Sequence, residues 1–569
     1  MGLLTASNCI DQVKLRDAQE WQCVVATACT VMIVLLVVRT FYLLLWKPYS
    51  RRRFYEKQGI RGPCFRPIVG NLPEIRELRA SLPEVCDPSE PGARRVGLEF
   101  FVFSEKYGKV SIFEQGSLTR IILADAKLAK EVLVAKGGHY HKAALNGEVF
   151  NQIAGISSIL IANEGDWKQK NHIMSPAFRH TFLENLFHHV LESGNELVTK
   201  WQTMVDNTTE KQGVEVAVDL DVPETLLDII VKTTFGSTTV EGGDICGIHK
   251  AVRFMFATLG PRLTGYGRLF PGYNFLPTPT NIKLWIEKRY METVLESIVS
   301  ARLKQVKQLK GSSKSIQTKQ NLYGSDLLGM MLEAMEAGNS SMTAPQLLDQ
   351  CKTMIAASDT PTSMLLIWTL TLLAMHPDWQ ERARFEVQEV VGEAIPKHDM
   401  FSHLKLMDMV LNETMRFIPP VAALFRDAID AHQIGSVSIA AGTNVIIPLS
   451  VLNHNKEVWG NDAHLFNPGR WDVKNRANNN FNNFMPFGGG NRICLGRNLA
   501  RMEAKLLLSV LLRRFTFSVA PGYMHSPGVG DLVLWPKFGA QLRIKNVDSY
   551  TSNLKPVCAP KKMHDAYAN

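Results

Sequence analysis

Apolar residues recur every three to four positions over most of this chain, which is the spacing of one face of an α-helix. Segments with this period lie at residues 126–135, 182–206, 284–309, 344–376, 379–391 and 406–417, and another begins after Cys494. Two shorter segments, residues 109–125 and 436–449, alternate apolar and polar residues, and each predicts two strands. Gln115 and Gly116 fit the turn of the first pair. The pattern therefore predicts a mainly α fold with small β-sheets (α+β).

One stretch, residues 23–46, is apolar apart from Arg39 and a few threonines, and it is long enough to cross a bilayer as a single helix. A basic flank follows it, formed by Lys47, Arg51, Arg52 and Arg53, and the positive-inside rule places such a flank in the cytosol. A buried core helix is the alternative, which this flank disfavours. We therefore expect a single-pass anchor in the endoplasmic reticulum membrane, with residues 1–22 in the lumen and the main part of the chain in the cytosol.

The composition changes near the two ends of the chain, so the part between them is interpreted as one large domain. Residues 47–75 are rich in basic residues, glycine and proline, which favours an extended tether over a helix. Residues 76–547 would then form the catalytic domain. Residues 548–569 lack hydrophobic periodicity, which predicts a disordered tail.

The overall composition limits the classes of protein to which the chain can belong. Hydrophobic residues make up 46% of the 569 residues, which suffices for a large folded core. The net charge of +9 comes from basic residues dispersed along the chain, so it gives no support for nucleic-acid binding. The nine cysteines are scattered and lack CxxC pairing, which argues against a disulfide framework and against a cysteine-based zinc site. We expect the folded part in a reducing compartment.

The stretch FGGGNRICLG stands directly before a helical pattern. Phe487, Gly490, Arg492, Cys494 and Gly496 follow the spacing FxxGxRxCxG, which resembles the haem-binding loop of the cytochrome P-450 superfamily. The resemblance implies haem b with the Cys494 thiolate as the axial iron ligand, and such a ligand favours cleavage of the O–O bond. Backbone N–H groups of the turn and the start of the next helix would stabilise the thiolate. An ordinary buried cysteine is the alternative.

The resemblance also assigns roles to the other residues of this loop. Gly490 and Gly496 would let the backbone approach the macrocycle, where a Cβ atom would clash. Phe487 would pack beside the sulfur and exclude water. Arg492 would bind a haem propionate, because its guanidinium has the matching fork geometry.

A second propionate-binding motif of the superfamily, WxxxR, is present in part. Trp167 matches its tryptophan, but Asn171 stands in place of the arginine. Lys170 or His172 could supply the missing charge. Arg426 is the better candidate for a second propionate ligand by its position, and an ordinary surface arginine is the alternative.

Three charged residues upstream of the loop are expected to act together. Glu413 and Arg416 lie three positions apart, hence on one helix face, and Arg470 follows in the sequence FNPGRW. In the superfamily such residues form a buried network beneath the haem loop. Because a buried ion pair is costly to break, we expect a structural role for these residues.

Proton delivery is expected from the segment AASDTP, residues 356–361, which resembles the superfamily pattern (A/G)Gx(D/E)T(T/S). Asp359 and Thr360 match the acid and the alcohol that deliver protons during oxygen activation. Ala357 replaces the usual glycine. Pro361 is a stronger departure, since it should kink the helix and leave the carbonyl of Ala357 free. The kink could open the helix and so replace the oxygen-binding groove that other members form by a local bulge, or it could displace Thr360.

From about residue 55 to 545 the chain resembles the plant clan typified by the seventy-two family, for example in KYGKV, ETMRFIPPVAALFRDA and LVLWPKFGAQLRI. The clan implies a monooxygenase that uses O2 and hydroxylates a small hydrophobic substrate, such as a terpenoid, steroid, fatty acid or plant hormone. A membrane-bound NADPH-dependent cytochrome P-450 reductase is the implied electron donor. Its acidic face could meet a set of basic residues, which a solvated surface explains equally well: Lys168, Lys170, Arg497 and Arg501.

Substrate contacts are expected from a loop at residues 141–153, from Ala356 and Ala357, and from the turn between Val421 and Leu424. The cavity should be large and mostly apolar. None of these segments selects one substrate.

Two other functions remain open at the level of sequence. A haem-thiolate isomerase or dehydratase would rearrange a peroxide without a reductase, but such enzymes tend to lose the acid and alcohol pair. The second alternative is a non-catalytic haem-binding scaffold. It is favoured by the departures from the superfamily motifs at Pro361 and Asn171.

Overall fold

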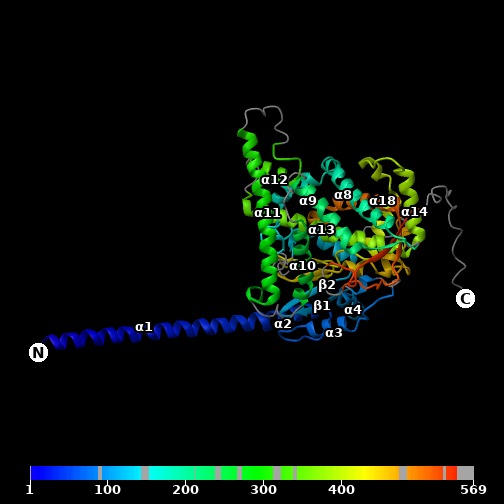
Figure 1. Ribbon diagram of the computed structural model, residues 1–569. Coiled ribbons are helices and arrows are strands. Elements are labelled where there is room, and N and C mark those ends of the chain that lie inside the picture. Colours follow the sequence, from blue (N-terminus) through cyan, green and yellow to red (C-terminus); the bar gives the residue numbers. More distant parts are fainter. Residues whose placement is uncertain are drawn as a thin grey trace.

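The computed structural model describes residues 2–87, 92–95, 97–142, 151, 153–209, 212–236, 245–264, 272–311, 322–336, 342–472, 483–528 and 533–547. Helices form most of it and pack into a thick body, with the sheets along one side (Figure 1). This is the mainly α fold with small sheets that the hydrophobic pattern predicts. The longest helices of the body are α8 (His180–Asp206), α9 (Val218–Phe235), α10 (Ile245–Thr264), α11 (Pro279–Gly311), α13 (Ala344–Met375) and α18 (Arg497–Arg514).

The periodic segments of the sequence correspond closely to observed helices. Besides α8, α11 and α13, they match α5 (Ala126–Lys130) with the π-helical turn η3 (Glu131–Ala135), α14 (Pro377–Val390) and α15 (Lys405–Phe417). The remaining helices of the body are α3 (Leu72–Ala80), α4 (Leu98–Tyr107), α7 (Glu164–Met174), α12 (Leu327–Glu336), α16 (Leu449–Leu452) and α17 (Lys456–Trp459).

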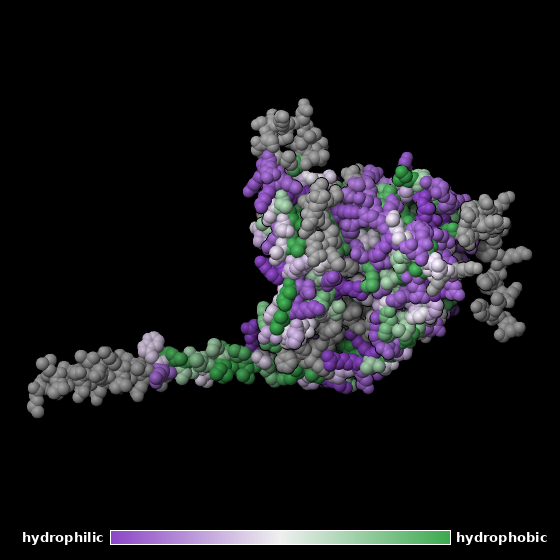
Figure 2. Space-filling model, in the orientation of Figure 1, coloured by the Kyte–Doolittle hydropathy of each residue, from purple (hydrophilic) through white to green (hydrophobic). Residues whose placement is uncertain are grey.

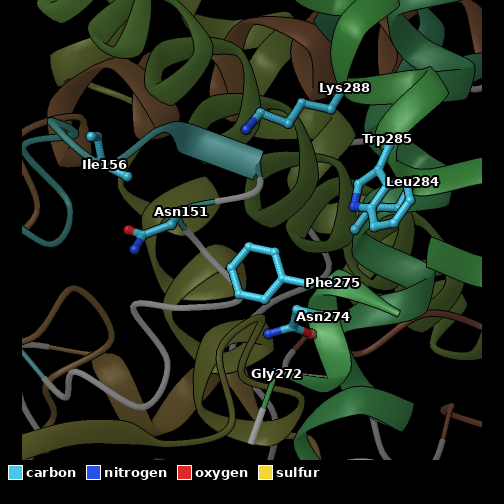
Figure 3. Close-up of a pocket in the computed structure, with 8 residues that line it drawn as sticks. All are labelled: Asn151, Ile156, Gly272, Asn274, Phe275, Leu284, Trp285 and Lys288. Carbon is cyan, nitrogen blue, oxygen red and sulfur yellow. The ribbon is translucent and has the colours of Figure 1, made fainter. Parts of the chain in front are cut away.

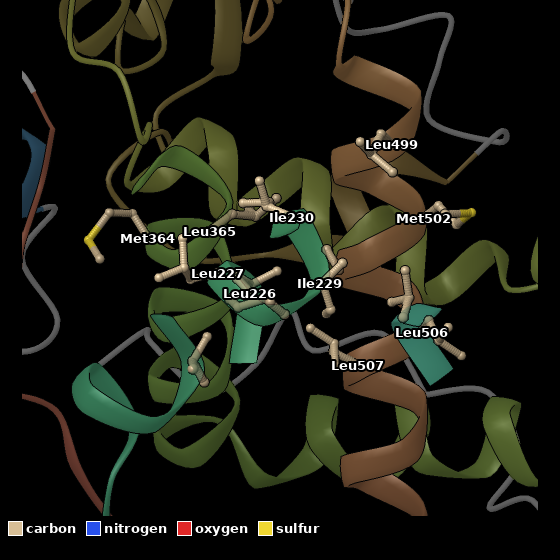
Figure 4. Close-up of a cluster of buried hydrophobic side chains, with 14 of the residues drawn as sticks. Leu226, Leu227, Ile229, Ile230, Met364, Leu365, Leu499, Met502, Leu506 and Leu507 are labelled. Atoms are coloured by element: carbon tan, nitrogen blue, oxygen red, sulfur yellow. The ribbon is translucent and has the colours of Figure 1, made fainter. Parts of the chain in front are cut away.

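Helix α13 is the central element of the body. It begins with a capping box, in which the Thr343 side chain and the Gln346 side chain each bond the other residue's backbone N–H. Most of its side chains are buried, and it packs against α9, α11, α15 and α18. Side chains from α9, α13 and α18 meet in one apolar cluster (Figure 4), and each stabilises the fold by roughly 1.5–3 kcal/mol. The labelled members are Leu226, Leu227, Ile229, Ile230, Met364, Leu365, Leu499, Met502, Leu506 and Leu507.

Three small sheets are formed. The largest has the order β1-β2-β8-β5-β3, with β1 (Val110–Gln115), β2 (Leu118–Leu123), β3 (Tyr140–Lys142), β5 (Leu424–Ala428) and β8 (Asn444–Ile447). A second has the order β4-β10-β9, with β4 (Val214–Ala217), β9 (Phe515–Val519) and β10 (Gln541–Asn546). The third is the hairpin of β6 (His432–Ile434) and β7 (Val437–Ile439).

The strands expected at residues 109–125 pair with each other as β1 and β2. Those expected at residues 436–449 also form, as β7 and β8, but they do not pair with each other. Strand β7 pairs with β6, whereas β8 lies between β2 and β5. The reason is burial, because all four residues of β8 are buried and the strand is therefore suited to the centre of the larger sheet.

A long amino-terminal helix projects from the body (Figure 1). It consists of α1 (Gly2–Phe41), the π-helical turn η1 (Tyr42–Trp46) and α2 (Lys47–Glu56). Within it, Val24–Glu56 qualifies as a membrane span by length and composition, and its most apolar 18-residue window has a mean hydropathy of 2.3 and is not covered by the body. Figure 2 shows this part as a band of hydrophobic residues next to the body.

The segment expected to be a tether, residues 47–75, differs from that expectation at its start. Residues 47–56 continue the helix as α2, which packs on β1 and β2. Arg52 is buried there and donates to Glu114 at 2.7 Å, while Arg51 donates to the carbonyl of Gly442 at 2.7 Å. These arginines fasten the helix to the sheet, so the folded body begins at α2. The expected tail, residues 548–569, lies outside the described residues.

Candidate functional site

The Cys494 loop is closed by its own backbone. The N–H of Cys494 donates to the carbonyl of Phe487 at 3.0 Å, and α18 starts immediately after the loop. Cys494 keeps an accessible surface although protein atoms surround it on most sides, and this burial raises the pKa of its thiol. Backbone N–H groups of Gly496 and Arg497 and the charge of Lys142 lower that pKa in turn. The loop therefore holds donors and cations beside the sulfur, as an anionic thiolate ligand requires.

The two glycines of the loop differ in what surrounds them. Gly490 has a positive φ of 64°, and a Cβ atom there would lie 2.1 Å from the carbonyl oxygen of Leu133 in η3. Gly490 thus lets the loop pack on η3, a reason different from the expected approach to the macrocycle. At Gly496 the nearest atom to such a Cβ would be Phe178 Cε1 at 3.9 Å, so the protein leaves room at this position. Phe487 is half-buried against the main apolar core.

Three cations gather near Cys494. Lys142 in β3 pairs in register with Arg426 in β5, and Arg492 lies close enough to both to lower their pKa values. Burial is the larger cause in each case: it lowers the pKa of Lys142 to about 7 and that of Arg426 to about 10. The Nη1 atom of Arg492 is buried and has no hydrogen-bond partner within the described part of the chain. One buried and two half-buried cations, together with an unsatisfied buried donor, fit a group that carries two carboxylates, as haem does in its propionates.

Trp167 lies directly beside this group of cations. The guanidinium carbon of Arg492 is 4.6 Å from the centre of the Trp167 ring, and Arg492 Nη2 donates to the carbonyl of Ala162 at 2.9 Å. Asn171 supplies no charge, and Lys170 does not replace it, because Lys170 is buried and bonds Asp166 at 2.5 Å. His172 is exposed.

Sequence reasoning missed Lys142, although it brought Arg426 and Arg492 into the site. The residue stands in the short stretch YHK, which carries no motif. Its role depends on the pairing of β3 with β5, strands far apart in the sequence. No local pattern could have indicated that contact.

The acid and alcohol of α13 are both buried. Asp359 is 2% exposed, and burial raises the pKa of its carboxyl to about 7, against the opposing effects of the Ser363 hydroxyl and the Arg253 charge. Thr360 is fully buried, and its Oγ1 has no hydrogen-bond partner among the described residues. Other threonines of α13 behave differently, since the Thr369 hydroxyl donates to the carbonyl of Leu365 at 2.6 Å. Thr360 thus offers a free hydroxyl, and Asp359, the residue before it in the helix, offers a carboxyl that can hold or release a proton at neutral pH.

Helix α13 continues through Pro361 as one helical element from Ala344 to Met375. Proline has no N–H, so the carbonyl of Ala357 still lacks the bond that residue 361 would otherwise donate. Ala357 is exposed within an otherwise buried stretch, and Ser358 is half-buried. Ala356, in contrast, is 5% exposed, so of the two alanines expected in the pocket only Ala357 presents accessible surface.

A further acid, Glu503 of α18, was not found from the sequence. It is 1% exposed, and its Oε1 has no partner in the part of the chain that is described. Burial, and then the nearby charge of Asp359, raise the pKa of Glu503 to about 8. The available signal was a glutamate on the apolar face of a helix that also carries Leu506 and Leu507. Two acids from α18 and α13 therefore face one region of the core.

The network beneath the loop joins the three expected residues. Glu413 accepts from Arg416 at 2.8 and 2.9 Å and from Arg470 Nε at 3.2 Å. It also accepts from the N–H of Asn467 at 2.8 Å and from Trp471 Nε1 at 2.9 Å. The buried carboxylate of Glu413 is thus satisfied by donors within the protein. The network therefore fixes the segment that leads to the Cys494 loop and leaves none of its groups free for chemistry.

The expected substrate segments are placed in part. Leu424 begins β5 and lies near the loop, 3.8 Å from the position of a Cβ on Gly488, while Val421 forms a bridge to Val533. Of residues 141–153, positions 143–150 and 152 lie outside the described residues. A pocket of about 350 Å³ opens beside that segment, between it and the start of α11 (Figure 3). It is lined by Asn151, Ile156, Gly272, Asn274, Phe275, Leu284, Trp285 and Lys288.

Comparison with known proteins agrees with this site. The cytochrome P450 family model matches residues 65–542. Cytochrome P450 734A1 of Arabidopsis thaliana is 32% identical over 538 residues, which are 94% of this chain and 99% of that protein. A cytokinin hydroxylase of the same plant is 31% identical over 525 residues, 91% and 98% of the two chains. Cytochrome P450 72A397 of Kalopanax septemlobus is 32% identical over 515 residues, 88% and 94%. The chain therefore belongs to the cytochrome P450 family, whose members bind haem through an axial cysteine thiolate, and it is a monooxygenase.

Proposed function

We propose that this P450 hydroxylates a small hydrophobic substrate of the terpenoid, steroid, fatty-acid or plant-hormone class. It would use O2 and electrons that a membrane-bound NADPH-dependent cytochrome P450 reductase supplies. Haem, held by Cys494 and by the Lys142, Arg426 and Arg492 group, supplies the oxygen chemistry when bound. The observation that carries the proposal is the free hydroxyl of Thr360 beside the acid of Asp359.

The properties of these two residues suit repeated proton delivery. With a pKa of about 7, Asp359 populates both its protonated and its ionised form near neutral pH, so it can give a proton and take up another. The Thr360 hydroxyl is not engaged by its own helix and can accept one hydrogen bond while donating another. An isomerase or dehydratase has no need for external protons, so this pair favours monooxygenation.

The proposal is tested by removing the Thr360 hydroxyl. We expect Thr360→Ala to keep oxidising NADPH while product formation falls at least about tenfold, with hydrogen peroxide released instead. Thr360→Ser keeps a hydroxyl and is the matched control, so it should retain most of the product yield. A Thr360→Ala enzyme that forms product with undiminished yield per NADPH would refute the role of this pair, and turnover without any reductase would favour an isomerase.

The substrate class is supported by the relatives and by the apolar lining of the pocket. A relative that covers nearly the whole chain is named a cytokinin hydroxylase, which is why hormones are included. A screen by optical difference spectra would identify ligands directly, because a substrate that reaches the haem changes its absorption spectrum. We expect lipophilic compounds to bind and charged compounds of the same size to bind weakly.

Electron delivery is proposed at the face where α18 begins. Arg497 stands at the first position of α18, and its Nη1 donates to the carbonyl of Cys494 at 3.2 Å. The side chains of Lys168 and Arg501 are 64% and 29% exposed, so both could meet an acidic reductase surface. Lys170 is excluded from this group, because its side chain is 5% exposed.

We propose that the protein resides in the endoplasmic reticulum membrane with the body in the cytosol. The apolar part of the amino-terminal helix supports the anchor. Its basic flank supports the orientation, because Arg51 and Arg52 bind the body and therefore lie on the same side of the membrane as the body.

A further inference from the structure

A cluster of two histidines and an aspartate lies at the end of β3 opposite to Lys142. His139 Nδ1 is 2.9 and 3.0 Å from the two carboxylate oxygens of Asp430, and His432 Nδ1 is 3.2 Å from Asp430 Oδ1. One ligand atom from each residue lies within 4.8 Å of the others. Neither the haem site nor the proton-delivery residues use this cluster.

The spacing of these atoms suits a small divalent cation. Bonds of about 2.0–2.1 Å in a tetrahedral zinc site place neighbouring ligand atoms about 3.4 Å apart. The distances of the two histidine Nδ1 atoms from Asp430 Oδ1, 2.9 and 3.2 Å, are shorter than that value, and all ligand atoms lie within 4.8 Å of one another. Small side-chain rotations would therefore bring the ligand atoms to the spacing of a tetrahedral site. Two imidazoles and one carboxylate are also ligands that zinc prefers. His139 and Asp430 are 41% and 55% exposed, which leaves an open side for a water molecule as fourth ligand.

The surroundings of His432 orient its ring for such a role. Its Nε2 lies 2.7 Å from the hydroxyl of Tyr140, a residue that is 3% exposed. Metal-bound histidines commonly donate their second ring nitrogen to a fixed partner in this manner. In the tautomer in which Nε2 donates to Tyr140, the Nδ1 lone pair faces Asp430, whose Oδ1 lies 3.2 Å and whose backbone carbonyl oxygen lies 3.1 Å away, and a cation bound between Nδ1 and Oδ1 stabilises this tautomer.

We propose that His139, Asp430 and His432 bind Zn²⁺. The ion would link the turn before β3 to the start of β6, and it would hold the end of the β3–β5 ladder. The other end of that ladder carries Lys142 and Arg426. A bound ion would therefore stiffen the strand pair that presents both cations to the haem site.

The test uses the purified full-length haem protein and Zn²⁺ alone. Equilibrium dialysis followed by elemental analysis should find a single equivalent of Zn²⁺ retained by the wild-type chain. His432→Gln and Asp430→Asn should weaken this binding at least about tenfold, and Tyr140→Phe by about tenfold. His464→Gln, which removes an exposed histidine outside the cluster, is the matched control and should bind as the wild type does.

Two further measurements keep the outcome clear. The carbon monoxide difference spectrum of each variant shows whether it has folded around haem, so that lost zinc is not confused with lost structure. Zn²⁺ should also slow amide hydrogen exchange at residues 139–142 in the wild type and leave it unchanged in Asp430→Asn. Absence of stoichiometric zinc in the folded wild type, or equal zinc affinity in the folded Asp430→Asn variant, would overturn the proposal and leave a hydrogen-bonded cluster without a metal.

Discussion

At the scale of single residues, two groups of ionisable side chains of opposite sign lie wholly or partly buried in the described part of the chain. Lys142, Arg426 and Arg492 are cations near Cys494, and Asp359 and Glu503 are acids in the core. Like charges in a protein interior are destabilising unless a counter-charge or a proton neutralises them. Haem propionates would neutralise the cations. Burial raises the pKa values of the two acids, so that they retain protons near neutral pH and carry less negative charge.

The acid of Glu503 makes stability depend on pH. Its pKa is 4.5 in an ordinary environment and about 8 in the fold, so between these values the unfolded chain ionises while the folded chain does not. The contribution of the protonated Glu503 carboxyl to the free energy of unfolding is therefore fully present below pH 4.5. It is lost as the pH rises through about 8. We expect Glu503→Gln to be more stable than the wild type by roughly 1–3 kcal/mol at pH 8, with a difference near zero at pH 4.5.

Thermal unfolding of both proteins across this range checks the expectation. Glu393→Gln is the matched control, because its side chain is 87% exposed and its replacement should change nothing. A stability difference that does not vary with pH would show that Glu503 is already ionised in the folded protein.

The residues of the loop and of the acid and alcohol pair could be named from the sequence because each belongs to a short motif. Lys142 and Glu503 could not. Lys142 acts through a strand pairing between distant segments, and Glu503 through the packing of α18 on α13. Gly490 was predicted to admit the haem macrocycle, and the contact that the structure shows at this position is with the carbonyl of Leu133.

At the scale of elements, α13 combines a proline with an uninterrupted helix. Pro361 removes one backbone bond and leaves the Ala357 carbonyl available at an accessible part of the helix. We expect Pro361→Ala to restore that bond and to stabilise the protein by up to about 3 kcal/mol. Because the free carbonyl is lost, the same variant should release more hydrogen peroxide per NADPH oxidised.

A matched control exists in the next helix. Pro377 is in the first turn of α14, where the backbone N–H has no partner within the helix, so Pro377→Ala should change stability and peroxide release little. Unfolding midpoints and peroxide yields measured for both variants test whether Pro361 lowers the stability of the helix and limits the release of peroxide. Equal stability of Pro361→Ala and the wild type would mean that the helix already compensates for the missing bond.

Most long helices could be predicted from the period of the apolar residues. Helix α9 was not named, although Asp221, Glu224, Asp228 and Lys232 give it a narrow polar stripe at helical spacing; Pro223 in its interior is a residue that normally interrupts a helix and so obscures the pattern. The strands β7 and β8 were predicted, but their partners were not, since pairing depends on which strand the fold buries.

At the scale of the whole molecule, the end of the amino-terminal helix, α2, is packed on the body. Residues 47–56 looked like part of a tether because of their basic composition, but Arg52 is buried against Glu114 and Tyr55 against the sheet. The helix that this basic segment forms belongs to the domain because of these tertiary contacts. In the proposed orientation, the body would therefore lie close to the membrane surface, on the side of the basic flank.

This arrangement predicts the outcome of a protection experiment. Protease added to sealed microsomes should degrade the body, while an epitope attached before residue 2 should survive until detergent is added. A catalytic body that resists protease in the absence of detergent would reverse the proposed orientation.

The most direct test of the account concerns the bond between Cys494 and haem. Carbon monoxide added to the reduced wild-type protein should produce the red-shifted Soret band of thiolate-ligated haem. Cys494→Ser should abolish that band, because serine offers no thiolate. A wild-type spectrum typical of imidazole-ligated haem, or a purified protein without haem, would contradict the central claim.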